Sequence, residues 1–411
     1  MTTTPPECNI PDNARFGIDG GHLLHAVVWP RSATYDEICE MYSRYVAKHY
    51  HTNATVIFDG YGGPPSTKQG QQNRRMAKAS SADIVFTGSM QTTTTQEQFF
   101  GNKSNKSRLI QALSTHLRKM GIEVSQAVSD ADVLIVSTIL QLAESEHTVV
   151  LVGTDTDLMV MLVARAMSSA SLFMFNPSTS NKPHKIFNIN MIQQSVGDKV
   201  QNLLFLHAVT GCDTTSVLFR QGKKKAFKLL TEKGDLAMEV TVFNRATANH
   251  EDVSLAGENF LLALYGGTKF STLDEYRYYA YKRTIASNSV SSTFHLATLP
   301  PTSAAPRQHS FRTYLQVQQW LGNELPPTEW GWQLLNNIFV PVPTDLPAAP
   351  EKLMKLISCK CKVGCMSRCG CRRAGMSCSA MCSPCIGLGC TNSPKTEDLE
   401  DDDVDLESSD T

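Results

Sequence analysis

Carboxylates that follow apolar segments are the side chains of this sequence best placed to do chemistry. Residues 149–152 form a wholly apolar run that ends at Gly153, and Asp155 and Asp157 follow it. Such a run predicts a strand buried on both faces, and the apolar residues 158–163 predict a returning helix. Both carboxylates then lie in a strand-to-helix turn, where open α/β folds bind ligands. Asp is also a common helix N-cap, so this turn by itself leaves a capping role open.

Five more Asp residues occupy similar places along the chain. Asp19 and Asp59 each follow an apolar, strand-like run, Asp130 and Asp132 open the apolar segment 133–142, and Asp213 closes the apolar segment 203–210. If these segments share one sheet, all seven carboxylates meet at one edge. Two like charges about 4 Å apart in a partly buried site cost on the order of 4 kcal/mol at an effective dielectric of about 20, so such a cluster needs cations. Clustered oxygen ligands select Mg²⁺ or Mn²⁺.

The order of the acids resembles that of the flap-endonuclease (5′-nuclease) family within the PIN-like fold. The shared features are a first Asp after the opening strand, a second in an F-D-G motif, an acidic pair at a helix start, a D-x-D turn and a late G-x-D. The resemblance covers roughly residues 11–240. It implies two Mg²⁺ (or Mn²⁺) ions per active site, one activating water and the other stabilising the leaving oxygen of a phosphodiester. Their implied ligands are Asp19, Asp59, Asp130, Asp132, Asp155, Asp157 and Asp213.

Basic residues accompany the acids in the family's order. Its P-P-x-x-K motif falls on residues 64–68, after a two-residue insertion, and its downstream Arg falls on Arg75. The resemblance implies that Lys68 and Arg75 are catalytic and neutralise the scissile phosphate. Arg74 is spaced to share a helical face with them and to contact phosphates, although a solvated basic helix is the alternative. Residues 222–226 resemble half of the family's duplex-gripping hairpin, which assigns nucleic-acid binding to Lys223, Lys224 and Lys225.

The sequence departs from the family pattern in places. Asp130 and Asp132 stand where the family typically has Glu, which shortens their reach to a metal ion by a methylene. The segment between Arg75 and Lys119 is short for the helical arch through which the family threads single strands. Because residues 66–106 are polar and show little apolar periodicity, we predict a mobile or substrate-ordered loop there. His207 is predicted to be a packed histidine, because no second soft ligand is spaced near it.

Composition narrows the class of protein. At 411 residues the chain is long enough for two or three domains, and its net charge of −1 gives no global field that would attract nucleic acid. The N-terminal residues lack a signal-peptide pattern, and no apolar run reaches the roughly 18 residues of a membrane span. We therefore predict an intracellular, nuclear protein without a membrane partner, whose basic surfaces are local.

Nine of the twelve cysteines fall in one short segment. They are Cys359, Cys361, Cys365, Cys369, Cys371, Cys378, Cys382, Cys385 and Cys390. The segment has too few apolar residues to bury a core, and disulfides would leave one cysteine unpaired, so it predicts a zinc module. Nine thiolates give three tetrahedral Zn²⁺ ions their twelve bonds if three sulfurs bridge. The spacing resembles that of tesmin/CXC-type and pre-SET cysteine clusters, in which such a three-zinc cluster is found.

Basic residues within this cysteine segment predict a contact with DNA. Arg368, Arg372 and Arg373 would offset the negative charge of the zinc–thiolate cluster while presenting cations to phosphates. A purely structural zinc module that mediates protein contacts is the alternative. The acidic residues after the module predict a disordered tail.

These patterns predict an α/β, PIN-like parallel sheet flanked by helices, a helical extension and a small zinc-cluster module. The predicted divisions are a flexible tail (1–10), the nuclease-like domain (11–240), the helical extension (241–340), a linker (341–355), the zinc module (356–393) and the acidic tail (394–411). The leading functional hypothesis is a Mg²⁺-dependent, structure-selective DNA nuclease with a zinc-bound DNA-binding module. The alternatives are a non-catalytic nucleic-acid or chromatin binder of mobile-element origin that keeps the nuclease fold, and a PIN-like ribonuclease.

Overall fold

The computed structural model describes two compact units, residues 1–345 and 346–411. In the first unit the described residues are 10–11, 13–60, 63–68, 70, 81–128, 130–166, 170–177, 183–287 and 299–344. In the second they are 359–361, 365–373, 378, 382, 385 and 390–392. Arg74, Arg75, the predicted acidic tail and residues 1–9 lie outside the described residues, as does the predicted linker after residue 344.

A six-stranded sheet in the order β3-β2-β1-β4-β5-β6 forms the centre of the first unit. Its strands are β1 (Arg15–Asp19), β2 (Thr55–Phe58), β3 (Glu123–Gln126), β4 (Thr148–Val152), β5 (Ser171–Asn176) and β6 (Lys185–Asn188). The first five are parallel, and β6 runs antiparallel to β5. The chain adds β2 and β3 on one side of β1 and then β4 and β5 on the other. The winding therefore reverses between β1 and β4, which is where open parallel sheets bind ligands.

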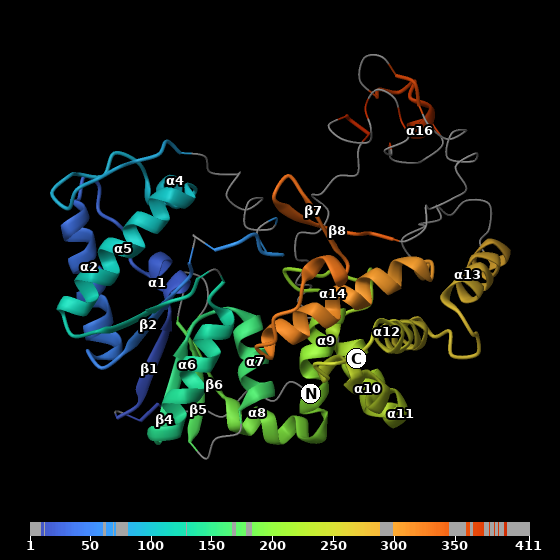
Figure 1. Cartoon of the computed structure of the whole chain (residues 1–411), viewed down its shortest axis with the longest axis horizontal. Coiled ribbons are helices and arrows are strands. Elements are labelled where there is room, and N and C mark those ends of the chain that lie inside the picture. Colours follow the sequence, from blue (N-terminus) through green and yellow to red (C-terminus); the bar gives the residue numbers. More distant parts are fainter. Residues whose placement is uncertain are drawn as a thin grey trace, which may run out of the picture. The chain divides into compact units, whose positions relative to one another are not determined.

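Helices cover both faces of this sheet (Figure 1). One face carries α1 (Gly20–Ala26), α2 (Tyr35–Tyr50) and α5 (Lys103–Lys119), and the other carries α6 (Asp132–Ser145), α7 (Thr156–Arg165) and α8 (Ile189–Val196). Along β4, Val150 packs into the first core and Leu151 into the second. Because successive strand side chains point to opposite faces and both faces are covered, the strand is apolar throughout.

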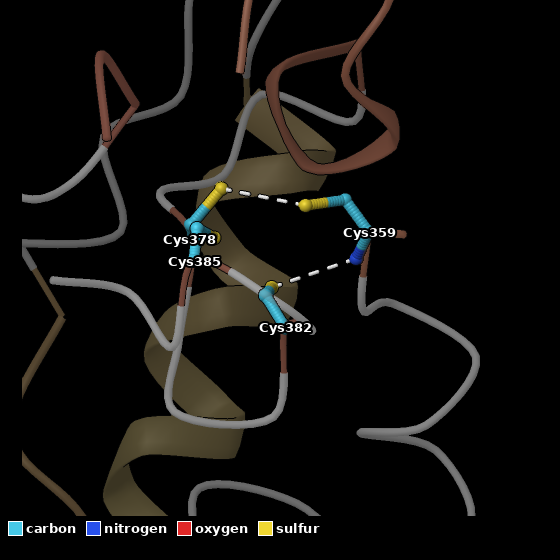
Figure 2. Close-up of side chains that lie close together, drawn as sticks. All are labelled: Cys359, Cys378, Cys382 and Cys385. Atoms are coloured by element: carbon cyan, nitrogen blue, oxygen red, sulfur yellow. Dashed lines mark hydrogen bonds between the residues drawn. The ribbon is translucent and has the colours of Figure 1, made fainter. Parts of the chain in front are cut away.

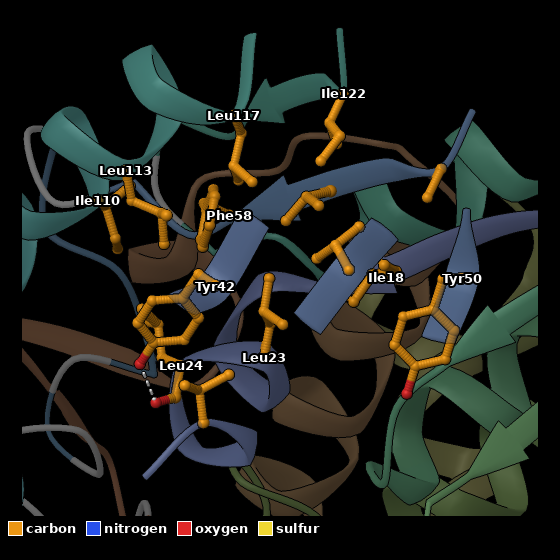
Figure 3. Packing of buried hydrophobic residues seen from close by; sticks show 14 of the residues in the cluster. Ile18, Leu23, Leu24, Tyr42, Tyr50, Phe58, Ile110, Leu113, Leu117 and Ile122 are labelled. Carbon is orange, nitrogen blue, oxygen red and sulfur yellow. Dashed lines mark hydrogen bonds between the residues drawn. The ribbon is translucent and has the colours of Figure 1, made fainter. Parts of the chain in front are cut away.

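The first core shows how the local sequence fixes an element and its buried face. Thr34 and Glu37 form the capping box that starts α2, with the Glu37 carboxylate accepting from the Thr34 backbone N–H at 2.8 Å. The helix then buries Tyr42, whose hydroxyl donates to the Leu24 carbonyl at 2.6 Å (Figure 3). This bond joins α2 to α1, the helix that follows Asp19.

An extension of helices after the sheet completes the first unit, and it takes in the end of the predicted nuclease-like domain (11–240) as well as the predicted helical extension (241–340). It comprises α9 (Leu203–Val209), α10 (Lys223–Glu232), α11 (Gly234–Glu239), α12 (His250–Tyr265), α13 (Leu273–Ser287) and α14 (Ala304–Trp320), with 3-10 turns η1 (Gly197–Asn202), η2 (Val240–Asn244) and η4 (Pro327–Glu329). Most of α14 is buried, and it packs against α9 and α12. At its end Trp320 joins the core beneath α6 and α7. The extension is therefore part of the same packed unit as the sheet.

Two elements differ from the sequence-based prediction. The predicted loop at 66–106 contains α4 (Gln96–Phe100), and α5 already begins at Lys103, so that part of the prediction is wrong. The helix is short and polar except for Phe99 and Phe100, which are buried, so no helical periodicity was visible.

An unpredicted hairpin, β7 (Trp332–Leu335) and β8 (Ile338–Pro341), turns at two Asn residues with positive φ. Such φ values are those of a type I′ hairpin turn.

The second unit is a knot of cysteines with one short helix, α16 (Gly370–Arg373). The predicted fold class is confirmed: a mixed α/β architecture with a mostly parallel sheet flanked by helices, followed by helices and a C-terminal cysteine cluster. Among the described residues, every helix is too short or too polar to cross a membrane.

Candidate active site and cysteine cluster

Six of the seven predicted acids line one cavity of about 1330 Å³ at the carboxyl edge of the sheet. They are Asp19, Asp59, Asp130, Asp132, Asp155 and Asp213. Lys68 lines the same cavity. Asp19 and Asp213 are separated in the sequence by more than half of the first unit, so it is the fold that brings them together.

The strand ends position three of these carboxylates. Asp19 ends β1 and caps α1, its Oδ1 accepting from the Gly21 N–H at 2.8 Å, and Asp155 caps α7 in the same way through Asp157 N–H at 2.8 Å. The capping role left open by the sequence is therefore real, yet both residues also face the cavity. One oxygen of each serves the helix, and the carboxylate has a second oxygen with which to bind a ligand.

Asp59 is held by a tight turn after β2. Its Oδ1 accepts from the Ala131 N–H at 3.0 Å, which links the end of β2 to the start of α6. A Cβ on Gly60 would lie 2.1 Å from the Ala127 carbonyl oxygen and 2.3 Å from that of Val128. Because these are backbone atoms that cannot swing away, only glycine fits after Asp59.

Lys68 lies between the acidic pair of α6. Its Nζ donates to Asp130 Oδ2 at 2.9 Å and also to Asp132 Oδ2, and its side chain is only 10% exposed. The ammonium group is in effect a stand-in cation, and it shows that these two carboxylates are spaced to hold a positive charge. The donor set, all carboxylate oxygen, fits Mg²⁺ or Mn²⁺.

The electrostatics of the cavity also favour a cation. Burial, followed by the charge of Asp59, raises the pKa of Asp19 to about 7, and burial raises the pKa of Asp130 to about 7 against the opposing effect of Lys68. Burial and the charge of Asp157 raise the pKa of Asp155 to about 6. The pKa of Asp59 is raised as well, mainly by burial. Ionising this set near neutral pH is therefore unfavourable until positive charge enters the cavity.

Asp157 behaves differently from the other six acids. Its Oδ1 lies 2.6 Å from Nε2 of His207, a residue that is 5% exposed. Burial alone would raise the pKa of Asp157, but the hydrogen bond and charge of His207 outweigh it and lower the pKa below its usual value. The prediction of a packed histidine captured its burial but missed this bond.

The predicted nucleic-acid lysines after Asp213 divide into two kinds. Lys223 Nζ donates to the Gly211 carbonyl at 2.7 Å and to the His207 carbonyl at 3.3 Å, and burial lowers its pKa. It therefore caps the C-terminal end of α9, whose carbonyls carry partial negative charge. Lys224 is exposed, and Lys225 is exposed with its Nζ on Gln221. All three residues are exposed, but the ammonium group of Lys223 is held by backbone carbonyls.

Sequence reasoning missed the other wall of the cavity. Lys106 on α5 lines it, and although burial lowers the pKa of Lys106, the charges of Asp59 and Asp19 raise it in opposition. Around it lie His25, Trp29 and Phe100, with residues 92–98. The positive charge of Lys106, which follows the basic residues at 74–78 in the sequence, was the one signal that could have placed it at the site. The prediction of a loop over residues 66–106 hid that signal. The described carboxylates surround the cavity without three of them meeting within 4.8 Å.

The nine cysteine sulfurs of the second unit lie close together, and none of the described cysteines forms a disulfide. Sets of four with all sulfurs within 4.8 Å of one another include Cys359, Cys361, Cys365 and Cys369, and also Cys365, Cys378, Cys385 and Cys390. Figure 2 shows Cys359, Cys378, Cys382 and Cys385, which form another. Six of the nine cysteines are buried.

Five of these sulfurs are shared between sets, and three of the five lie at nearly equal spacing. The Sγ–Sγ distances are 3.7 Å for Cys359–Cys365, 3.8 Å for Cys359–Cys378 and 3.6 Å for Cys365–Cys378. Two sulfurs bound to one tetrahedral Zn²⁺ at about 2.3 Å are about 3.8 Å apart. Each edge of this triangle therefore matches the spacing of two sulfurs bound to one ion.

The predicted DNA-binding arginines also lie in this unit. Arg368, Arg372 and Arg373 are all exposed. Arg372, however, donates to the Thr391 carbonyl and to Asn392 Oδ1, so its guanidinium closes the unit on itself. Arg368 and Arg373 are the better placed of the three to contact phosphates.

Comparisons with known proteins give distant structural neighbours. No protein-family model and no curated protein matches the chain in sequence. Among solved structures, the T5 D15 protein co-crystallised with metal ions is 13% identical to this chain. The match covers 75% of this chain and 90% of the T5 D15 chain, with a TM-score of 0.40. The catalytic core of Rad2 in complex with DNA substrate is 16% identical (75% and 88% covered, TM-score 0.36), and the eukaryotic junction-resolving enzyme GEN-1 is 12% identical (74% and 65%, TM-score 0.35). At such low identity and TM-score, we carry no residue role over from these proteins.

The contrast between Asp155 and Asp157 predicts opposite effects on metal-free stability. The folded-state pKa of Asp155 lies above its unfolded value, so stability is lost as the pH rises from the unfolded pKa to about 6, and the full penalty applies above that. Asp155→Asn should therefore stabilise the chelator-treated protein at pH 8 by about 1 kcal/mol, a figure discounted because the residue is exposed, and the gain should vanish near pH 4. Asp157→Asn should instead lose about 1 kcal/mol with the hydrogen bond to His207. Urea unfolding at both pH values measures this, and equal shifts for the two variants would contradict the electrostatic assignment.

Proposed function

We propose that this chain is a Mg²⁺- or Mn²⁺-dependent, structure-selective DNA nuclease that carries a zinc-bound DNA-binding module. The observation that supports it is the convergence of six carboxylates and Lys68 on one cavity at the switch point of a parallel sheet. Carboxylates gathered in this way are unstable as a structural device, because each raises the pKa of its neighbours. The motif order noted in the sequence favours phosphodiester hydrolysis over other metal chemistry.

The residues of the cavity have different proposed roles, which depend on their position. Asp19, Asp59 and Asp155 at the strand ends, with Asp130, Asp132 and Asp213, would hold two divalent ions. When bound, the ions supply an activated water and a Lewis acid for the leaving oxygen. The ammonium group of Lys68 lies next to the acidic pair. There it would neutralise the negative charge that develops on a phosphate in the transition state. The cavity walls exclude part of the solvent, which strengthens each of these electrostatic contacts.

Cleavage of defined substrates tests the proposal. Full-length protein with Mg²⁺ should hydrolyse flapped or otherwise branched DNA faster than plain duplex, and Asp155→Asn should abolish the reaction while the protein stays folded. The substrates to compare are single-stranded, flapped and duplex DNA, and RNA. Binding without cleavage by the wild type would favour the non-catalytic binder, and cleavage of RNA alone would favour the ribonuclease.

Lys68 gives a second prediction. If its ammonium stabilises charge that develops in the transition state, Lys68→Ala should lower kcat by roughly 10² at saturating Mg²⁺ with a smaller change in KM. Lys224→Ala, an exposed lysine away from the acids, is the matched control and should affect KM and its salt dependence instead. A Lys68→Ala variant that changes only KM would make this residue a binding cation. Arg75 is proposed to act with Lys68.

The cysteine unit is proposed to bind three Zn²⁺ ions. Cys359, Cys365 and Cys378 would be the bridging thiolates, and three ions would then use all nine sulfurs. Together with Arg368 and Arg373, the module would contact DNA phosphates, with affinity that falls steeply with salt. A nuclear location remains a prediction of the same proposal.

Native mass spectrometry of the full chain counts the ions. We expect three zincs and no alkylatable thiol among the nine cysteines. Cys365→Ser removes a bridge between two sites and should leave at most one ion, whereas Cys390→Ser removes a terminal ligand and should leave two. Two zincs with one reactive cysteine in the wild type, or four disulfides without zinc, would refute the bridged cluster.

A further inference from the structure

The bond between His207 and Asp157 has no part in the site as proposed so far. Asp157 is the one predicted acid that does not line the cavity, and its Oδ1 is taken by His207 Nε2 at 2.6 Å. Their side chains are 6% and 13% exposed, so the pair is buried beside the other carboxylates. An apolar ring would fill the same space without a hydrogen-bond donor for the acid.

We propose that His207 is a positioning residue for the metal centre: by holding Oδ1 of Asp157 it fixes this residue beside Asp155, which accepts from the Asp157 backbone N–H and lines the cavity. This inference rests on the proposed metal-dependent function. Groups that orient a metal-binding side chain from behind set the affinity of the site although they never touch the ion. Because Nε2 is already committed to Asp157, it is not offered to a metal.

Two other helices fix the histidine itself. The Trp320 ring at the end of α14 lies 5.6 Å from the imidazole, with an angle of 33° between the two planes. Lys223 from α10 donates to the His207 carbonyl, and His309 from α14 lies 2.8 Å from the Val209 carbonyl at the end of α9. The position of α9, and therefore of the imidazole, depends on α10 and α14 as well as on the sheet.

This arrangement gives the extension a role in the chemistry. At the start of α7 the Asp157 backbone N–H donates to Asp155 Oδ1. This bond does not orient the Asp157 carboxylate. The orientation comes from α9, some fifty residues later in the sequence, supported by α14 about one hundred residues beyond that. A change in the packing of the extension should therefore alter metal affinity in the sheet domain.

Direct metal binding by the full-length protein tests the proposal. Mn²⁺ affinity is measured by calorimetry and by electron paramagnetic resonance, without substrate. His207→Phe, which keeps the ring but not the donor, should bind Mn²⁺ about 10- to 100-fold more weakly than the wild type. His207→Gln can still donate to Asp157 and should restore most of the affinity, and saturating Mg²⁺ should restore most of the cleavage rate to the Phe variant.

A matched control separates this effect from lost stability. His116→Gln alters another partly buried histidine, whose ring contacts Ser43 and Glu40 and none of the seven acids or α9, so it should change the unfolding temperature and leave Mn²⁺ affinity unchanged. Equal Mn²⁺ affinity of folded His207→Phe and wild type would overturn the proposal, as would a Gln variant no better than Phe. A wild type that binds no Mn²⁺ would overturn the proposed function as well, so the two failures are distinguishable.

A measurement on the wild type decides the matter even if His207→Phe does not fold. In protein labelled with ¹⁵N at histidine, the Nε2 proton of His207 should remain hydrogen-bonded when Mg²⁺ is added. Loss of that proton signal, or direct coupling of Mn²⁺ to an imidazole nitrogen of His207, would make the residue a ligand and sink the positioning role.

Discussion

Repulsion among buried carboxylates is the constraint on which the rest of the sheet unit depends. Asp19, Asp59 and Asp155 are brought to one edge because β1, β2 and β4 are parallel neighbours, and the sheet cannot form without bringing them there. Each acid is compensated locally by a different group. Backbone N–H groups at helix starts bind one oxygen of Asp19 and of Asp155, Lys68 binds the α6 pair, and His207 binds Asp157.

The compensation of Asp157 comes from a distant part of the chain, the extension, which is packed deeply into the unit. Most of α14 is buried although the helix carries many polar residues, and its Gln316 accepts from Thr214 beside Asp213. The guanidinium of buried Arg312 donates to the Gly331 and Val342 carbonyls. Such a helix is costly unless its polar groups find partners, so its path is specified by hydrogen bonds as much as by apolar contact.

In the cysteine unit, too, closely packed ionisable side chains depend on what they bind. Its buried side chains are nearly all thiols, which give little hydrophobic stabilisation, and their sulfurs approach one another at 3.4 to 3.8 Å. Burial raises the pKa of Cys371 to about 12, whereas the Arg372 backbone N–H lowers that of Cys369 to about 6. A set of thiols packed this closely has its charge and its fold determined together by what it binds.

The sequence by itself determined the strands, their order of appearance and the positions of the seven acids. Apolar β-branched runs and capping residues are local signals, and each was read within a few residues of where the element lies. The cysteine spacing was equally readable, because metal ligands must recur at short intervals. What stayed hidden was the helix α4 and the hairpin β7–β8, whose few apolar residues gain their meaning only from long-range packing.

Only the tertiary structure decided what each acid does. Nothing local to Asp157 distinguishes it from Asp155 two residues earlier, yet one is paired with His207 and the other faces the cavity. Nothing local to Lys223 distinguishes it from Lys224, yet one caps α9 and the other is exposed. The physical reason is that charge is neutralised through space by groups far apart in sequence. A carboxylate's neighbours, and hence its pKa and its freedom to bind a metal ion, are set by packing and not by spacing along the chain.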